Sequence, residues 1–222
     1  LTRTPDAHFL TEVRYKGTKV VSVSPDYAES TTSSDAWLNV KAGTDAALAM
    51  AMGHVILKEY YIDKETPYFK EYAKEFTDMP FLVRVEDING AVQPGRFLNA
   101  KDLGRQEEGA DFHMLLIDEI TNEIVIHNGT MGERHTNPQK WNLRLENRET
   151  GAKIDPRLSV FDQREDVTVV KLPYFGDEEH EGVIERAIPT ITVQTVDGPV
   201  KVTTVYDLIL ANYGIDRGIG GE

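Results

Sequence analysis

The feature that most constrains the fold is the alternation of helical and strand patterns along residues 1–85. Residues 4–6, Thr-Pro-Asp, suit the start of a helix, because they can cap free amides, fit the first turn and complement the helix dipole. Apolar runs at 19–23 and 36–40 are short enough for buried strands. The apolar stretch 45–52 predicts a core helix, buried on most of its circumference. Strands that alternate with helices are typical of parallel sheets, so we expect an α/β fold with a Rossmann-like parallel sheet layer.

The pattern changes after this α/β part. Residues 86–177 contain short apolar runs, such as 114–117 and 124–126, separated by charged and turn-forming stretches. We interpret this region as a β-rich insertion or subdomain, with a hairpin connection between those two runs. Residues 178–222 then supply strands, a tight turn at Asp197-Gly198 and a last helix, and we expect them to return to the α/β part.

Local chemistry marks the ends of several elements. Thr203 or Thr204 can cap the last helix, which we expect to end before Gly214. Gly17 likewise permits a left-handed exit from the first helix.

Composition excludes several classes of function. The chain has no cysteine, so it can form no disulfide and supplies no thiolate ligand for zinc or an iron–sulfur cluster. Its formal net charge of -13 opposes binding to nucleic acid or to anionic lipid. No apolar run reaches the roughly 18 residues that suggest a membrane-spanning helix. Nucleic-acid partners and direct membrane insertion are therefore not expected.

Two loops that follow successive predicted strands are the candidate ligand-binding elements. In open parallel sheets, loops at the carboxyl ends of strands face a ligand crevice. Gly43 permits close approach of the backbone, and the amides at the start of the next helix offer positive partial charge to an anion. The alternative is purely structural, with one loop a turn and the other a helix cap. The candidate residues are Ser24, Pro25, Asp26, Tyr27, Ala28, Gly43, Thr44 and Asp45.

Several distinctive segments occur in one order along the chain. They are residues 2–9 (TRTPDAHF), 12–18 (EVRYKGT), 25–29 (PDYAE), 43–47 (GTDAA), 51–55 (AMGHV), 77–80 (TDMP), 173–176 (PYFG) and 203–208 (TTVYDL). Through them the chain resembles the molybdopterin oxidoreductases, and among these the respiratory nitrate reductase alpha subunits. The resemblance runs through essentially all of the sequence and is least distinctive in the middle.

The resemblance implies a cofactor and a way to hold it. In this family molybdenum lies between two molybdopterin guanine dinucleotides, and the two candidate loops would contact one of the two dinucleotide tails. Asp45 could accept two hydrogens from the Watson–Crick edge of guanine, and Asp26 could accept one from a ribose hydroxyl. Which of the two dinucleotides is contacted stays open.

The resemblance also implies that the redox groups lie elsewhere. The iron–sulfur ligands and the aspartate that ligates molybdenum in the family precede the segment that matches residue 1, and both ends of the sequence look cut. We therefore expect no catalytic residue, no metal ligand and no bound cofactor in this chain alone. Thr4, Asp6 and His8 would lie near the cofactor cleft, although capping and structural roles explain them equally well. His54 is interpreted as a core residue.

The other histidines lack the spacing of metal ligands, and structural or surface roles are expected for them. They are His113, His127, His135 and His180.

The implied parent reaction is the two-electron reduction of nitrate to nitrite. The implied partners are the remainder of the alpha subunit, an iron–sulfur beta subunit and a haem-containing membrane gamma subunit, at the cytoplasmic face of the membrane. The alternatives are another molybdopterin oxidoreductase, such as a selenate or chlorate reductase, and a non-catalytic nucleotide-binding or interaction module. An open reading frame that continues on both sides, with upstream iron–sulfur ligands, would reject the last.

Overall fold

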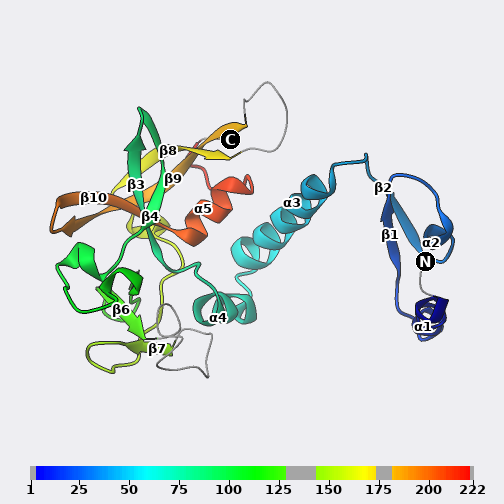
Figure 1. Cartoon of the computed structure of the whole chain (residues 1–222), viewed down its shortest axis with the longest axis horizontal. Helices are drawn as coiled ribbons and strands as arrows, with labels where there is room; N and C mark the ends of the chain where they lie inside the picture. Colours follow the sequence, from blue (N-terminus) through cyan, green and yellow to red (C-terminus); the bar gives the residue numbers. More distant parts are fainter. Residues whose placement is uncertain (1–3, 129–143, 174–181, 221–222) are drawn as a thin grey trace. The chain divides into compact units, whose positions relative to one another are not determined.

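The computed structural model describes residues 4–128, 144–173 and 182–220 (Figure 1). The chain separates into two compact units, Leu1–Met52 and Gly53–Glu222. It is a mixed α/β protein, as predicted.

The first unit contains a pair of parallel strands. Its elements are α1 (Thr4–Tyr15), β1 (Val21–Ser24), α2 (Glu29–Thr32), β2 (Ala36–Asn39) and the first part of α3 (Asp45–Ile56). β1 and β2 pair in register from Val21↔Ala36 to Ser24↔Asn39. Asp35, just before β2, accepts a hydrogen bond from the Val20 amide at 2.8 Å and pairs with Arg14 of α1 at 3.4 Å. The Val20 amide, and then Arg14, lower the pKa of Asp35, so this carboxylate stays charged and ties α1 to the strand pair.

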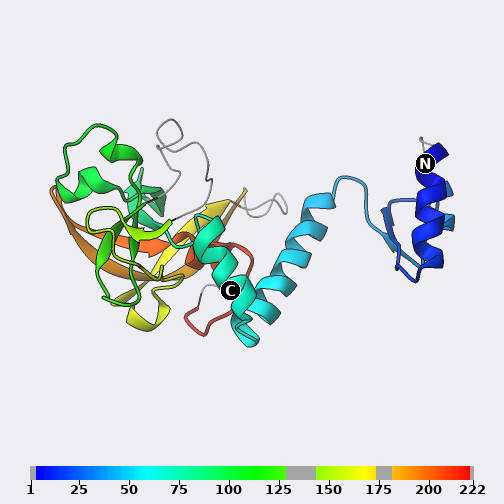
Figure 2. The same ribbon diagram turned by 90° about the horizontal axis from the view of Figure 1, so that it is seen from below.

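The second unit is built on a five-stranded antiparallel sheet with the order β4-β3-β10-β9-β8. The sheet curls, and its outer strands β4 and β8 contact each other. Figure 2 shows the bend in its orange strands. A second antiparallel sheet has the order β5-β6-β7. The strands are β3 (Leu82–Ile88), β4 (Ala91–Phe97), β5 (Leu115–Ile117), β6 (Ile124–Asn128), β7 (Arg144–Asn147), β8 (Asp166–Pro173), β9 (Val183–Thr195) and β10 (Gly198–Thr204).

Helices of this unit pack beside the sheets. After α3 come the π-helix η1 (Leu57–Asp63), α4 (Pro67–Phe76) and α5 (Val205–Asn212), with short 3-10 turns η2 (Ala100–Leu103), η3 (Ala110–Phe112) and η4 (Phe161–Gln163). Leu57, Tyr61, Ala73, Tyr206 and Leu210 form a buried cluster that joins η1, α4 and α5. Another cluster fills the space between the two sheets, with Leu82, Leu98, Leu115, Val160 and Val202 fully buried. Each such aliphatic side chain contributes about 1.5 to 3 kcal/mol on burial.

Several local predictions are confirmed. The segment 118–123 connects β5 and β6 in a hairpin. A tight turn joins β9 and β10, but its two residues are Val196 and Asp197, one position earlier than expected, because Gly198 already pairs with Thr195 as the first residue of β10. Thr204 caps α5, because its hydroxyl accepts a hydrogen bond from the Asp207 amide at 3.1 Å. Gly214, two residues after α5, takes the left-handed conformation with φ of 69°.

Two expectations about the α/β part need correction. The predicted core helix α3 has no buried residue in this chain. The run 19–23 was expected as a buried strand, but the valines of β1 are about half exposed. The apolar pattern predicts that these elements need a covering layer, and the described residues do not supply one. Parallel pairing among the described residues is limited to β1 and β2, whereas β9 and β10 join β3 and β8 in the antiparallel sheet.

Candidate functional site

The parallel pairing of β1 and β2 brings the two predicted loops to one edge. Ser24 and Asn39 are the last paired residues of the two strands, so both strands end at the same level. Residues 24–28, the first edge loop, leave β1 there, and residues 40–45, the second edge loop, connect β2 to α3. The structure therefore places all eight candidate residues at the carboxyl edge of the strand pair: Ser24 ends β1, Asp45 begins α3, and the other six lie on the loops.

The first edge loop is held by hydrogen bonds to its backbone. The indole N–H of Trp37 donates to the Ser24 carbonyl at 3.0 Å and to the Ser24 hydroxyl at 3.2 Å. That hydroxyl donates to the Asp26 carbonyl at 2.7 Å, and the Ala28 amide donates to the same carbonyl at 3.1 Å. These contacts use main-chain groups and the serine, so the side chains of Asp26 and Tyr27 stay available to a ligand.

The first edge loop carries several exposed side chains. The ring of Tyr27 is 63% exposed and meets Trp37 edge-on, with ring centroids 5.3 Å apart. Pro25 and Ala28 are also exposed. No described residue pairs with or hydrogen-bonds to the Asp26 carboxylate. The loop thus presents an aromatic surface and a free acceptor next to each other.

The second edge loop leads into the N-terminus of α3. Gly43 has φ of 82°, and a Cβ there would meet no atom within 4 Å, so its surroundings are open. The hydroxyl and the amide of Thr44 both donate to the Lys41 carbonyl, at 2.6 and 3.1 Å. The Leu48 amide donates to the Thr44 carbonyl and closes the first helical turn. The amides before Leu48 are therefore outside the intrahelical ladder and can bind an anion.

Asp45 is exposed in the first turn of α3. Its carboxylate has no hydrogen-bond or ion-pair partner within the described ranges. The Thr44 hydroxyl points its hydrogen back to Lys41 and does not accept from a first-turn amide, so it is not the side-chain cap that the structural alternative requires. Together the two loops offer free amides, two free carboxylates and one exposed ring. This set fits a ligand with phosphates, a ribose and a base.

The other residues considered from the sequence lie apart from this edge. His8 is exposed on α1, where Asp6 lies in the first turn. His54 contacts the Tyr213 carbonyl at 2.8 Å through Nδ1, which agrees with a structural role. His113 and His127 are buried in the second unit, and His135 and His180 lie outside the described residues.

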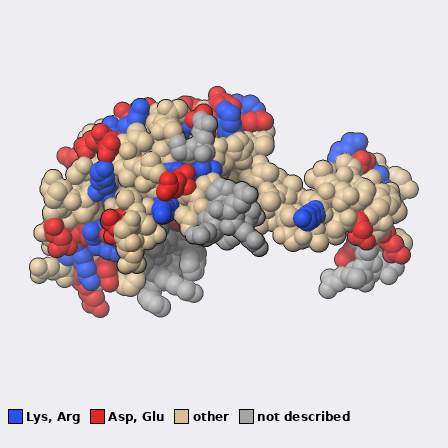
Figure 3. Space-filling model, turned by 90° about the horizontal axis from the view of Figure 1, so that it is seen from above, with Lys and Arg blue, Asp and Glu red and all other residues tan. Residues whose placement is uncertain are grey.

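The second unit contains a cavity of about 470 Å³ between η1, α4 and the segment before η4. Its cationic side chains are largely neutralised already. Lys70 pairs with Glu65 at 2.6 Å, Lys74 pairs with Asp155 at 2.6 Å, and Arg217 pairs with a buried aspartate at 2.6 Å. Acidic and basic side chains are also interspersed over the face of this unit in Figure 3. The cavity consequently offers no excess positive charge for a dinucleotide.

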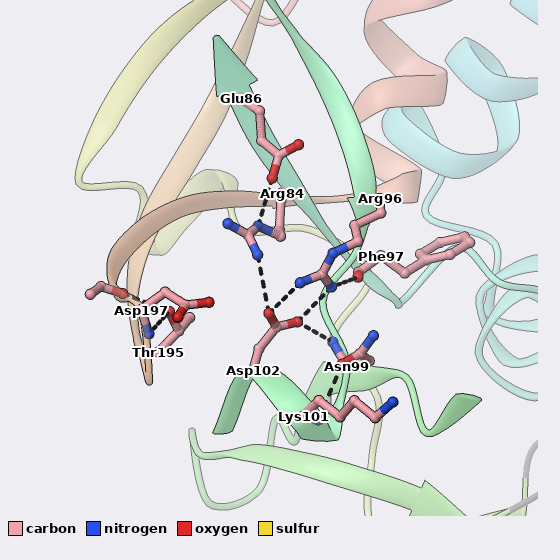
Figure 4. Close-up of polar contacts among 10 residues, drawn as sticks. Arg84, Glu86, Arg96, Phe97, Asn99, Lys101, Asp102, Thr195 and Asp197 are labelled. Atoms are coloured by element: carbon pink, nitrogen blue, oxygen red, sulfur yellow. Dashed lines mark hydrogen bonds and ion pairs between the residues drawn. The ribbon is translucent and has the colours of Figure 1, made fainter. Parts of the chain in front are cut away.

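Sequence reasoning missed a buried charge cluster around Asp102, which is 2% exposed (Figure 4). Arg96 donates to both oxygens of this carboxylate, at 2.7 and 2.5 Å. Arg84 donates to it at 3.1 Å, and the main-chain N–H of Asn99 donates to it at 2.9 Å. Burial acts to raise the pKa of Asp102, but these donors outweigh it and lower the pKa below its ordinary value. The cluster ties η2 to β3 and β4. Asn99 and Asp102 form a local capping box at the start of η2, whereas Arg84 and Arg96 reach Asp102 only in the folded chain.

Neither a metal centre nor a membrane span is found in the described part of the chain. No group of three or more His, Cys, Asp or Glu side chains is placed there to hold a metal ion. No helix there is long and apolar enough to cross a bilayer.

Comparison with known proteins identifies the family. The family model described as molybdopterin oxidoreductase matches residues 2–205. The chain belongs to this family. This molybdopterin oxidoreductase chain is 51% identical over 220 residues to the nitrate reductase alpha chain of Bacillus subtilis, a match that covers 99% of the chain and 18% of the relative.

Two further relatives place the chain within the family. It is 44% identical over 230 residues to the respiratory nitrate reductase 1 alpha chain of Escherichia coli, covering 98% of the chain and 18% of that relative. The match to the perchlorate reductase subunit alpha of Dechloromonas aromatica is 38% over 133 residues, covering 60% of the chain and 13% of the relative. The chain thus spans less than a fifth of the length of these relatives.

Proposed function

We propose that this chain is part of the catalytic alpha subunit of a respiratory nitrate reductase and that its two edge loops bind one of the two molybdopterin guanine dinucleotides. The observation that carries the proposal is the convergence of both loops at one strand edge in a chain of this family. Similarity to nitrate reductase alpha chains extends over nearly the whole chain, whereas similarity to a perchlorate reductase subunit is lower and covers 60% of it. Nitrate is therefore favoured as substrate over chlorate or perchlorate.

Each part of the edge has a role in this proposal. Gly43 and the free amides at the start of α3 receive the phosphates, because unpaired helical amides carry positive partial charge. Asp45 accepts two hydrogens from guanine, and Asp26 accepts from the ribose. Ser24 fixes the loop, Thr44 places the helix start, and Pro25, Tyr27 and Ala28 line the approach to the ligand. When bound, the molybdenum cofactor supplies the two-electron chemistry that converts nitrate to nitrite, while these loops orient it.

The proposal also accounts for the exposed strands and helix of the first unit. The β1–β2 pair would belong to a larger, Rossmann-like parallel layer, and α3 would be covered by other parts of the alpha subunit. Exposed Met52, Val55 and Ile56 support this, because a helix with so much apolar surface is usually buried. In the complete subunit residues 86–177 would form the inserted β-rich part, and residues 178–222 would return to the α/β part.

The proposed partners and location follow from membership in this group. Relatives named as alpha chains suggest an enzyme of several subunits. We propose the remainder of the alpha subunit, an iron–sulfur beta subunit and a haem-containing membrane gamma subunit as partners, at the cytoplasmic face of the membrane. The iron–sulfur ligands and the ligand to molybdenum would lie outside these 222 residues.

Photo-crosslinking tests the site. The complete alpha subunit that carries this sequence, freed of its cofactor, is irradiated with 8-azido-GDP, and the labelled peptides are identified by mass spectrometry. We expect label in residues 24–28 and 43–45, suppressed by excess GDP but not by ADP, because the acceptor geometry selects guanine. Label confined to the 470 Å³ cavity of the second unit, or spread over the surface without competition by GDP, would contradict the proposal.

A further inference from the structure

We propose that Trp37 is the positioning residue of the first edge loop, and that its indole N–H determines how firmly the guanine dinucleotide is retained. The inference rests on the proposed function. It adds a residue that contributes no group to the ligand and acts through the loop.

The position of Trp37 on β2 allows its side chain to reach the neighbouring strand end. In the strand pairing Trp37 lies opposite Ser22, yet its indole N–H reaches Ser24, two residues further along β1. Ser24 is the last residue of β1 and the first of the edge loop. The indole therefore binds the point at which the strand ends and the loop begins.

The contact is relayed into the loop by a hydroxyl. The indole N–H is shared between the carbonyl and the hydroxyl of Ser24, and the hydroxyl uses its own hydrogen to bind the Asp26 carbonyl at 2.7 Å. That hydroxyl also lies 3.4 Å from the Thr31 hydroxyl. Because it accepts the indole hydrogen and donates its own hydrogen to Asp26, these two bonds strengthen each other. The same Asp26 carbonyl receives the Ala28 amide. The indole thus begins a series of hydrogen bonds that runs through Ser24 to the backbone of Asp26 and Ala28.

The ring of Trp37 makes a second contact with the loop. The rings of Trp37 and Tyr27 form a T-shaped pair, with an interplanar angle of 85° and ring centroids 5.3 Å apart, an arrangement that aromatic pairs favour. The N–H acts on the loop backbone and the ring acts on Tyr27, so the two contributions can be separated by substitution. Trp37→Phe removes the N–H and keeps an aromatic ring.

Hydrogen exchange of the 222-residue chain measures the positioning without any cofactor. Losing a hydrogen bond of about 1 to 1.5 kcal/mol should speed exchange of the Ala28 amide about five- to tenfold in Trp37→Phe. Ser24→Ala should give a similar effect, and the double variant should add little to either, because both break the same relay. Tyr15→Phe, on an 87% exposed residue of α1, is the matched control and should leave exchange unchanged. Exchange of α1 should be unaffected in all variants.

Cofactor retention measures the consequence in the complete alpha subunit that carries this sequence. Guanine nucleotide released by acid is counted per subunit, and its rate of loss on dilution is followed. Trp37→Phe should lose the nucleotide about five- to tenfold faster than the wild type, with an unchanged thermal midpoint.

The possible results distinguish a failure of the role proposed for Trp37 from a failure of the proposed function. Wild-type rates of exchange and of nucleotide loss in Trp37→Phe would overturn the role of Trp37. Faster exchange throughout the first unit with a lowered midpoint would also overturn it, since Trp37 would then be a general packing residue. A wild-type subunit that releases no guanine nucleotide would overturn the proposed function, while the exchange data would still stand.

Discussion

Acidification should destabilise the second unit through His127. This imidazole is 4% exposed, stacks on Phe81 with ring centroids 4.9 Å apart, and contacts the Met114 carbonyl at 3.2 Å through Nδ1. Burial lowers its pKa from 6.5 to about 4, and the Met114 contact opposes this shift. Repulsion from Arg148, and from His113 when it is protonated, lowers the pKa further. The folded protein therefore holds His127 neutral at pH values at which the unfolded chain protonates it.

The sign and size of the effect follow from linkage. Because the folded pKa is depressed, the contribution is fully present above pH 6.5 and is lost as the pH falls from 6.5 through about 4. A fall of the pKa from 6.5 to about 4 corresponds to about 3 kcal/mol of unfolding free energy. Burial also lowers the pKa of His113, which adds a loss of the same sign in acid.

Urea unfolding at several pH values between 7.5 and 4.5 measures this contribution. His127→Phe keeps a ring against Phe81 but cannot titrate, so it is the matched control. The unfolding free energy of the wild type should fall more steeply with acid than that of the variant, by about 2 to 3 kcal/mol over this range. Parallel curves for the two proteins, or an imidazole pKa near 6.5 by NMR in the folded chain, would refute the reasoning.

Two substitutions test packing and charge in the second unit. Gly53→Ala would place a Cβ 2.3 Å from Cε1 of the Tyr213 ring, so we expect a loss of about 1 to 3 kcal/mol in urea unfolding, largely relieved when Tyr213→Ala is added. A Gly53→Ala protein as stable as the wild type would mean that the α3–Tyr213 contact is loose. Asp102→Asn would remove the buried counter-charge of Arg84 and Arg96. Because Arg96 is about half exposed and Arg84 keeps Glu86 as a partner, we expect a loss of about 1 to 3 kcal/mol, and Arg96→Lys should cost less. An Asp102→Asn protein as stable as the wild type would show that the cluster does not depend on the carboxylate.

Elements governed by nearby residues could be predicted from the sequence. The left-handed exit at Gly17 and the cap by Thr204 depend on a few adjacent residues, and both are confirmed. The turn between β9 and β10 was expected within one residue of its observed position. Strand pairing was harder to predict. β3 and β10 lie side by side although more than 100 residues separate them, and no local pattern sets that antiparallel partnership.

The remaining differences concern surfaces whose partners lie far along the chain or outside it. Apolar α3 was expected in a core because its composition requires cover, but composition does not say which residues provide the cover. The relatives are more than five times longer than this chain, so such cover is available in them. Asp102, Arg84 and Arg96 are ordinary charged residues in the sequence, and only the fold brings them together. The edge loops could be located because parallel strands place their carboxyl ends together, while the ligand contacts of Asp26 and Asp45 stay predictions.

The most direct test of the central claim is the guanine nucleotide content of the complete alpha subunit carrying Asp45→Asn. Asparagine preserves size and can still suit a helix N-terminus, but it presents a donor where guanine requires an acceptor. A bidentate contact gives about 1 to 3 kcal/mol of discrimination, so retention should fall roughly fivefold to more than a hundredfold with the thermal midpoint unchanged. Asp45→Ala should lose the nucleotide and also some stability, about 0.5 to 2 kcal/mol. An Asp45→Asn subunit with wild-type guanine content would contradict the account.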